Sequence, residues 1–292
     1  MTGDLPCYTK LSLSSMGIDE LITLAQKRGV DTLAITDRDC LAGLVRAKMT
    51  GARKGVSIVP AVEISCRDKE TNIYCEILCY LPDRPDRLEG LCHKNLLAKK
   101  SSSQKTVLAV AKRYPISPEL IQRCATGSTA VYEHHIIHAL FECGLTDRFY
   151  GDLHQELFGA GSESRVLYPV DYASPEEVID AIHDAGGIAV LSHPGENVTS
   201  ELLERLISLG LDGIEVFCPS NSEETMQRLI NRCKGTDLLM TGGTEFKGMF
   251  SNQPLCVGDV EVPESNIKSL LNYKTKMKKR RAAAKKAAEG AE

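Results

Sequence analysis

Several features that mark membrane and secreted proteins are missing from this sequence. No apolar run reaches about 18 residues, the shortest stretch that crosses a bilayer as a helix, so we expect no membrane-spanning segment. The N-terminus, MTGDLPCYTK, has no basic segment followed by an apolar stretch, which argues against a secretory signal. The 11 cysteines are odd in number and include no C-x-x-C pair, and several lie in apolar runs. A reduced, cytoplasmic protein is the simplest interpretation.

Outside the C-terminal tail, basic residues are outnumbered by acidic ones. The formal net charge is −4, but the segment 274–292 contains eight Lys or Arg and two Glu, so the preceding body carries −10. An acidic body argues against a general nucleic-acid-binding surface. The tail itself has two interpretations, a solvated extension or a weak electrostatic contact with RNA, ribosomes or an acidic partner.

The composition, 42% hydrophobic and 25% charged, is that of an ordinary globular protein. Short apolar runs alternate with helical patterns, and this alternation indicates right-handed βαβ units with parallel strands, in a doubly wound sheet or a barrel. Ile18–Arg28 and Ser174–Ala185 are expected helices, each ended by glycine. The expected strands are Thr32–Thr36, Val56–Val62, Ile73–Leu81, Gly187–Ser192, Gly213–Phe217 and Leu238–Thr241.

Polar residues gather where these runs end, and active sites of (β/α) barrels are built at the carboxyl ends of the strands. The residues in question are Asp37, Glu63, His193, Glu215 and Glu245. The segment 94–165 breaks the rhythm, because it is helical in pattern and has no convincing strand. We therefore expect a barrel in two parts, 1–93 and 166–270, a helical insertion at 94–165 that could cap the barrel mouth, and a basic Ala/Lys-rich tail at 271–292.

Eight segments resemble motifs of one family, the polymerase and histidinol phosphatase (PHP) superfamily, in family order. Asp4–Thr9 (DLPCYT) resembles D-L-H-x-H-T, Leu191–Gly195 (LSHPG) resembles L-A-H-P-G, and Thr241–Gly248 (TGGTEFKG) resembles T-G-G-S-D-F-H-G. The others are Ile35–Asp39 (ITDRD), Pro60–Ser65 (PAVEIS), Glu76–Tyr80 (EILCY), Glu133–Gly144 (EHHIIHALFECG) and Gly213–Ser220 (GIEVFCPS). The resemblance implies a distorted (β/α)7 TIM-like barrel with two or three divalent metals at its mouth, which polarise phosphoryl oxygens and activate water.

This chain departs from the implied ligand set. Five of the ten ligand positions hold residues that cannot ligate in these roles or, for tyrosine, do so poorly near neutrality: Pro6, Tyr8, Leu13, Arg38 and Lys247. Three positions keep their residue (Glu63, His135 and His193), and Glu76 and Glu245 still offer a carboxylate. The assignment of His135 leaves His134 and His138 on the same helix as alternatives. The remaining five ligands predict either one divalent metal (Mn, Zn or Fe) or none.

The replacements themselves have alternative interpretations. Arg38 and Lys247 place fixed positive charge among Glu63, Glu76 and Glu245, where they either neutralise these carboxylates as ion pairs or grip a phosphate. Tyr8 either hydrogen-bonds an anion or packs in the barrel mouth. Asp37 is expected to support the site from behind the ligands, and Glu215 to hold a strand end or an ion pair.

Three hypotheses of function follow. The first is a degenerate PHP protein, a pseudoenzyme or weak hydrolase, that binds a small phosphorylated ligand or a protein partner. The second is an active metal-dependent phosphoesterase that uses one metal on a small nucleotide or sugar phosphate. The third is a scaffold whose barrel mouth is closed by salt bridges and whose tail binds the partner.

Overall fold

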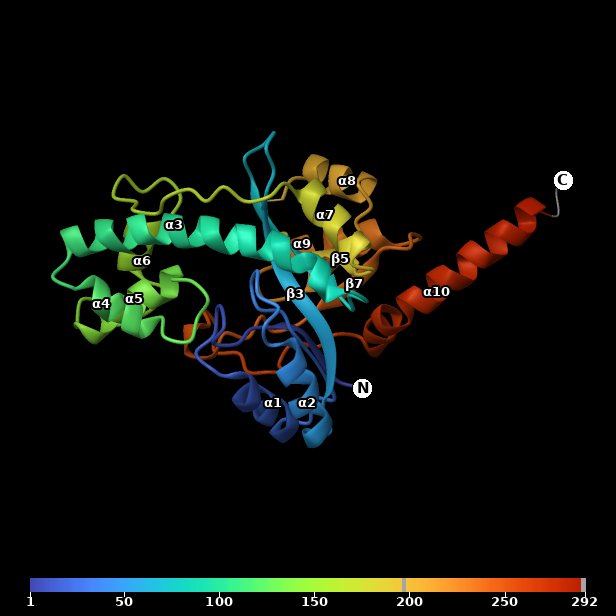
Figure 1. The fold of residues 1–292 in the computed structure, drawn as a ribbon, viewed down its shortest axis with the longest axis horizontal. Helices are drawn as coiled ribbons and strands as arrows, with labels where there is room; N and C mark the ends of the chain where they lie inside the picture. Colours follow the sequence, from blue (N-terminus) through green and yellow to red (C-terminus); the bar gives the residue numbers. More distant parts are fainter. Residues whose placement is uncertain (196–197, 290–292) are drawn as a thin grey trace.

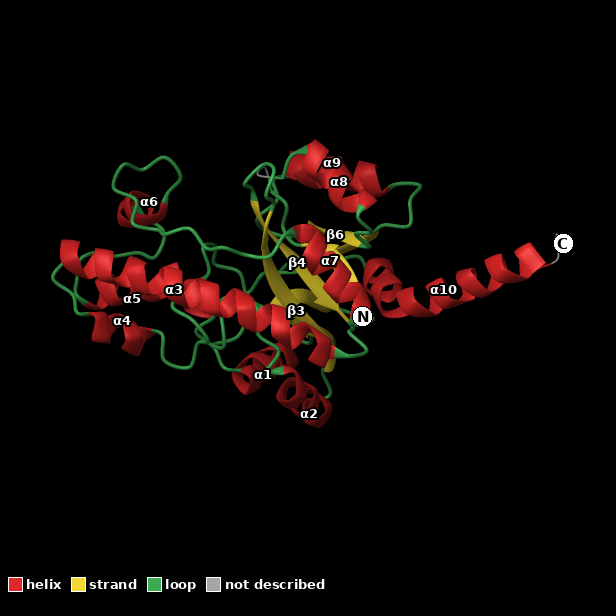
Figure 2. Ribbon diagram, turned by 45° about the horizontal axis from the view of Figure 1, so that its top comes forward, coloured by secondary structure: helices red, strands yellow, loops and turns green. Residues whose placement is uncertain are grey.

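The computed structural model describes residues 1–195 and 198–289 of the 292-residue chain. Within these residues, seven strands form a closed barrel. They are β1 (Gly3–Cys7), β2 (Thr32–Ile35), β3 (Ser57–Arg67), β4 (Tyr74–Tyr80), β5 (Ile188–Leu191), β6 (Gly213–Phe217) and β7 (Leu239–Gly242). Strands lie at the centre of the body and helices surround them (Figure 2). The expected α/β barrel is confirmed.

The strands are not all parallel, and in this respect the expectation from the sequence is wrong. β4 runs antiparallel to both β3 and β5, whereas the β1–β2, β2–β3, β5–β6 and β6–β7 pairs are parallel. The reason is the length of the connection, since only residues 68–73 separate β3 from β4 and a parallel crossover needs a dozen or more. Asn72 lies in this turn with φ of 59°, a left-handed conformation that asparagine tolerates.

Five helices pack around the barrel: α1 (Ile18–Lys27), α2 (Leu44–Lys54), α7 (Pro175–Asp184), α8 (Ser200–Ser208) and α9 (Glu223–Cys233). The two helices expected from the sequence are confirmed as α1 and α7. In α7, the Ser174 hydroxyl accepts from the Glu177 amide and the Glu177 carboxylate accepts from the Ser174 amide, so two terminal N–H groups are satisfied.

The insertion is formed by α3 (Glu89–Arg113), α4 (Pro118–Cys124), α5 (Glu133–Glu142) and α6 (Asp152–Phe158), and it extends to one side of the barrel (Figure 1). These helices have an apolar core of their own, built on residues such as Val110, Ile137 and Leu140. α3 begins at Glu89, so the expected boundary at residue 94 falls inside one continuous helix that reaches from the barrel into the insertion.

The tail belongs to α10 (Glu264–Glu289), which projects from the body in Figure 1. The helix begins before residue 271 because Ile267 and Leu270 bury their side chains with barrel residues such as Leu5 and Ala34. Residues 290–292 of the expected tail lie outside the described residues. None of the helices in the described part of the chain has both the length and the apolar character needed to cross a membrane.

The barrel closes between its first and last strands. Leu5 of β1 pairs with Gly242 of β7, and the buried Asp4 carboxylate accepts hydrogen bonds from Thr244 and from the Gly258 amide, each of 2.7 Å. This closure joins the start of the chain to residues about 240 positions away.

Replacing Gly242 by alanine should destabilise the barrel by about 1–3 kcal/mol, because an added Cβ would lie 2.2 Å from the Phe217 carbonyl oxygen, on backbone that cannot move independently. Gly90→Ala is the matched control, since Gly90 lies in α3 with nothing within 4 Å of an added Cβ. That change should be neutral or stabilising by up to about 1 kcal/mol. Urea unfolding of both variants measures the difference, and equal stability would contradict the steric argument.

Candidate functional site

The central feature of the barrel mouth is the guanidinium of Arg38, in the turn after β2. Its Nε lies 2.8 Å from Glu63 Oε2 on β3, and its Nη2 lies 2.8 Å from Glu76 Oε1 on β4. All three side chains are largely or fully buried. Burial by itself raises the pKa of Glu63, but Arg38 and His193 outweigh it and hold this pKa below its usual value. One cation is therefore shared by two buried carboxylates, which is the ion-pair arrangement of the two interpretations given above.

Tyr8 is fully buried at the end of β1, and its hydroxyl donates to Glu63 Oε1 at 2.8 Å. A phenol has one hydrogen to donate, and here Glu63 takes it. The structure thus places Tyr8 in the packed floor of the mouth, the second of the two interpretations given above.

His193, directly after β5, lies among carboxylates. Its Nε2 is 3.6 Å from Glu76 Oε2, its Nδ1 is 3.5 Å from Glu215 Oε2, and its backbone amide donates to the same Glu215 oxygen at 2.8 Å. Burial alone lowers the pKa of His193, but Glu245, Glu215, Glu76 and Glu63 together raise it to about 10. The imidazole is therefore a second buried cation at neutral pH.

Lys247 is the third cation, and its Nζ lies 3.5 Å from Glu245 Oε2 and 5.3 Å from the centre of the Tyr8 ring. Ser220 also donates to Glu245 Oε2, at 2.8 Å. Glu245 has φ of 50°, which is strained for a residue with a side chain. The strained backbone thus occurs at the residue whose carboxylate lies in the barrel mouth.

Two buried carboxylate oxygens in the mouth, Glu215 Oε1 and Glu245 Oε1, have no hydrogen-bond partner among the described residues. With Cys218, these two glutamates form a group whose potential ligand atoms lie within 4.8 Å of one another. Buried polar atoms are normally satisfied, so this pair of oxygens is a candidate position for one cation. Glu215 and Cys218 were not among the ligands predicted from the sequence.

His135 lies apart from this group. Its Nδ1 accepts from the Tyr132 amide at 3.1 Å, and its Nε2 lies 3.1 Å from Nε2 of His134. Burial lowers the pKa of His135 to about 4, so both ring nitrogens of the neutral imidazole serve contacts within the insertion. Of the five predicted ligands, only Glu245 belongs to a described group with metal-ligand spacing.

Asp37, expected to support the site, lies at the start of the turn that holds Arg38. It is buried, and its carboxylate accepts hydrogen bonds from the Thr9 amide at 2.8 Å and from the Thr9 and Ser12 hydroxyls at 2.5 and 2.6 Å. Asp37 thereby ties the segment after β1 to the end of β2.

A cavity of about 490 Å³ opens between the barrel mouth and the insertion. Four of its lining residues are cations and four are tyrosines, against the single carboxylate of Glu133: Arg38, Arg67, Lys99, Arg165, Tyr74, Tyr132, Tyr168 and Tyr172. Arg67 Nε, the Tyr132 hydroxyl and His154 Nδ1 are buried and lack partners among the described residues. Cationic forks beside aromatic faces suit an anionic ligand that also carries a flat ring.

Sequence patterns alone did not predict this cavity. Arg67 and Tyr74 lie on either side of the β3–β4 turn. Recognising this turn would have been necessary before strand alternation could place the two side chains on the same face. Ser192 was also overlooked, although its hydroxyl lies 3.0 Å from both Glu63 Oε1 and Glu215 Oε2.

No family model matches this chain, but individual proteins do. It is 29% identical over 256 residues to the phosphoribosyl 1,2-cyclic phosphate 1,2-diphosphodiesterase of Eggerthella lenta, covering 87% of this chain and 97% of that protein. It is 30% identical over 208 residues to the 5′-3′ exoribonuclease Rnm of Escherichia coli, with 70% of each chain covered. It is 26% identical to the 3′,5′-nucleoside bisphosphate phosphatase of Chromobacterium violaceum, over 83% of this chain and 86% of that one.

Solved structures agree with these relatives. A protein from Bifidobacterium adolescentis named a metal-dependent phosphoesterase superposes with a TM-score of 0.82 at 24% identity, over 92% of this chain and 95% of that one. An amidohydrolase from Chromobacterium violaceum with bound sulfate gives 0.79 at 22% identity, over 90% and 92%. The shared barrel, the motif order and these relatives together show that the chain belongs to the PHP superfamily of metal-dependent phosphoesterases.

Proposed function

We propose that this chain binds a small phosphorylated molecule in the cavity between the barrel mouth and the insertion, and that it is a weak or inactive hydrolase. The observation that carries the proposal is the Arg38 guanidinium, paired with Glu63 and Glu76 at 2.8 Å each. A metal bound by these carboxylates would have to displace a fixed cation from both. The remaining ligands do not fit a site of two or three metals, because Pro6, Leu13, Arg38 and Lys247 offer no donor.

The chemistry of the cavity supports an anionic ligand. Arg67 and Arg165 can each present a planar fork to phosphate oxygens. Arg67 Nε is buried without a hydrogen-bond partner among the described residues, and an anion that accepts its hydrogen bond would remove the cost of leaving this polar group unpaired. Two of the named relatives act, by their names, on a phosphoribosyl cyclic phosphate and on nucleoside bisphosphates. By analogy, we assign the ligand to the nucleotides and ribose phosphates, with a base on the tyrosines.

Titration calorimetry with adenosine 3′,5′-bisphosphate tests this assignment, with adenosine as the uncharged comparison. Arg67→Ala should weaken binding by about 10–100-fold, the loss of one hydrogen-bonded charge pair. Arg84→Ala is the matched control, because Arg84 is exposed and pairs with Asp86 outside the cavity. Equal binding of adenosine, or unchanged affinity in Arg67→Ala, would contradict the proposal.

A second candidate function is a phosphoesterase with one metal, favoured by the two unpartnered oxygens of Glu215 and Glu245. Metal content after incubation with Mn²⁺, Zn²⁺ or Fe²⁺, measured by plasma mass spectrometry, separates the two. The leading proposal expects the parent chain and Glu245→Gln to have the same metal content. One tightly held ion that this variant loses would favour the one-metal enzyme and make phosphatase assays the next step.

Restoring two histidines should not restore hydrolysis. In an Arg38→His, Lys247→His double variant, Pro6, Tyr8 and Leu13 still lack the donors of a multinuclear site. We expect phosphatase activity no higher than that of the parent chain with Mn²⁺ or Zn²⁺ present. Clear recovery from these two changes alone would show that the other three positions are dispensable.

A further inference from the structure

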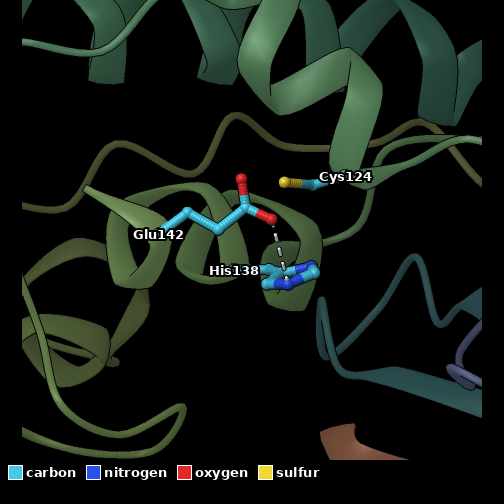
Figure 3. Close-up of side chains that lie close together, drawn as sticks. All are labelled: Cys124, His138 and Glu142. Carbon is cyan, nitrogen blue, oxygen red and sulfur yellow. Dashed lines mark ion pairs between the residues drawn. The ribbon is translucent and has the colours of Figure 1, made fainter. Parts of the chain in front are cut away.

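A group of donor side chains in the insertion lies outside the barrel mouth and outside the cavity. Cys124 is the last residue of α4, and His138 and Glu142 lie one helical turn apart on α5. Their sulfur, nitrogen and oxygen atoms all lie within 4.8 Å of one another, and the three side chains converge in Figure 3.

The spacing suits a small ion. His138 Nε2 is 3.6 Å from Glu142 Oε1, too long for a hydrogen bond. Ligand atoms about 2.0–2.3 Å from a tetrahedral zinc lie roughly 3.5 Å from one another, so the pair needs almost no adjustment. The exposure of Glu142 and the partial exposure of the other two leave a direction from which water can complete the coordination.

His138 differs from the other histidines of α5 in a way that bears on ligation. His134 and His135 face each other through their Nε2 atoms, and Nδ1 of His135 is used by a backbone amide. His138 makes no hydrogen bond among the described residues; its Nδ1 is buried without a partner, and its Nε2 has only the distant Glu142 carboxylate. Its ring is held instead by contacts with Phe149 and Phe250, so the imidazole is oriented while a nitrogen stays free.

Glu142 divides its two oxygens. Arg123, next to Cys124, donates to Oε2 at 3.2 Å, while Oε1 faces His138. The arginine thus fixes the carboxylate and leaves the other oxygen available, as an outer-shell partner of a metal ligand does.

We propose that Cys124, His138 and Glu142 form a zinc site that clamps α4 to α5. Mixed sulfur, nitrogen and oxygen donors in this number select zinc over the oxygen-preferring Mg²⁺ and Ca²⁺. The thiol releases its proton to solvent on binding, because the thiolate is the ligand. This site is separate from the mouth and independent of the ligand assigned to the cavity.

Cobalt(II) titration of the chelator-stripped, reduced full-length chain tests the site, because a thiolate-to-cobalt absorption band reports sulfur ligation directly. We expect the band to saturate at one Co²⁺ per chain, to be displaced by Zn²⁺ and to be absent in Cys124→Ser. His138→Gln and Glu142→Gln should each weaken binding at least about tenfold, since even the loss of an outer-shell partner costs about 10–100-fold.

Cys218→Ser is the matched control, because Cys218 is the thiol in the barrel-mouth group and its loss should leave the band unchanged. Circular dichroism of each metal-free variant checks folding, and should Cys124→Ser fail that check, His138→Gln carries the test. No band in the parent chain, a band that survives in folded Cys124→Ser, full affinity in folded His138→Gln, or a band lost only in Cys218→Ser would each overturn the proposal.

Discussion

Replacing Arg38 by methionine should lower the free energy of unfolding by about 3–5 kcal/mol, the cost of removing one partner from a buried ion pair. The guanidinium makes ion pairs of 2.8 Å with both Glu63 and Glu76, and the Glu63 side chain has no exposed surface. Without Arg38, the two carboxylates must either remain charged in a low dielectric or take up a proton. Urea unfolding at pH 7 measures the change.

Arg46→Met is the matched control, since the Arg46–Asp19 pair is solvent-exposed and such pairs contribute about 0–1 kcal/mol. A triple variant, Arg38→Met with Glu63→Gln and Glu76→Gln, should recover much of the loss, because no buried charge is then left alone. If Arg38→Met costs no more than the control, Arg38 does not stand in for a metal.

Stability should fall as the pH rises from about 6.5 to 10, and His193 should cause the fall. The pKa of His193 is about 10 in the folded chain and about 6.5 when unfolded. Because the folded pKa is raised, the contribution is complete below pH 6.5 and decreases by about 1.4 kcal/mol per pH unit until the folded group loses its proton. Urea unfolding at pH 6, 7.5 and 9 follows this change.

The contribution of His193 is isolated by comparing how steeply the free energy of unfolding changes with pH in the parent chain and in His193→Gln. His193→Gln should be less stable at pH 6 and should lose the slope attributed to one proton. His93→Gln, a change at an exposed position of α3, should keep the parent slope. Parallel pH profiles for the parent and His193→Gln would mean that the four surrounding carboxylates do not hold the imidazole protonated.

The fold was largely predictable from the sequence because buried strands and capped helices leave local patterns. Ser174, Glu177 and the glycine at 186 defined α7 almost to the residue. The direction of β4 was missed for a physical reason: β4 is buried on both faces, as a strand of a parallel sheet is. Only the short connection from Arg67 to Tyr74 distinguishes it.

Many residues of the site were predictable from the sequence, but their hydrogen-bond partners were less so. Glu63, Glu76 and Arg38 were expected together because the resemblance to the PHP superfamily places all three at ligand positions, and all three meet. His135 was expected with them because its motif is recognisable, yet the spacing of histidines on a helix does not say which ring nitrogen is already used. Glu215 was assigned a supporting role, and the sequence cannot reveal that one of its oxygens is left without a partner.

The closure of the barrel has a consequence for the order of events in synthesis. β1 is made first, but its partner β7 and the amides that Asp4 accepts from come about 240 residues later. Contacts so distant in sequence are slow to form, and a ribosome that makes 5–20 residues per second exposes β1 for many seconds before Gly242 emerges. Until β7 is made, β1 pairs with β2 on one side only and its other edge stays unpaired. We therefore expect the nascent chain to need chaperones until its last strand has been synthesised.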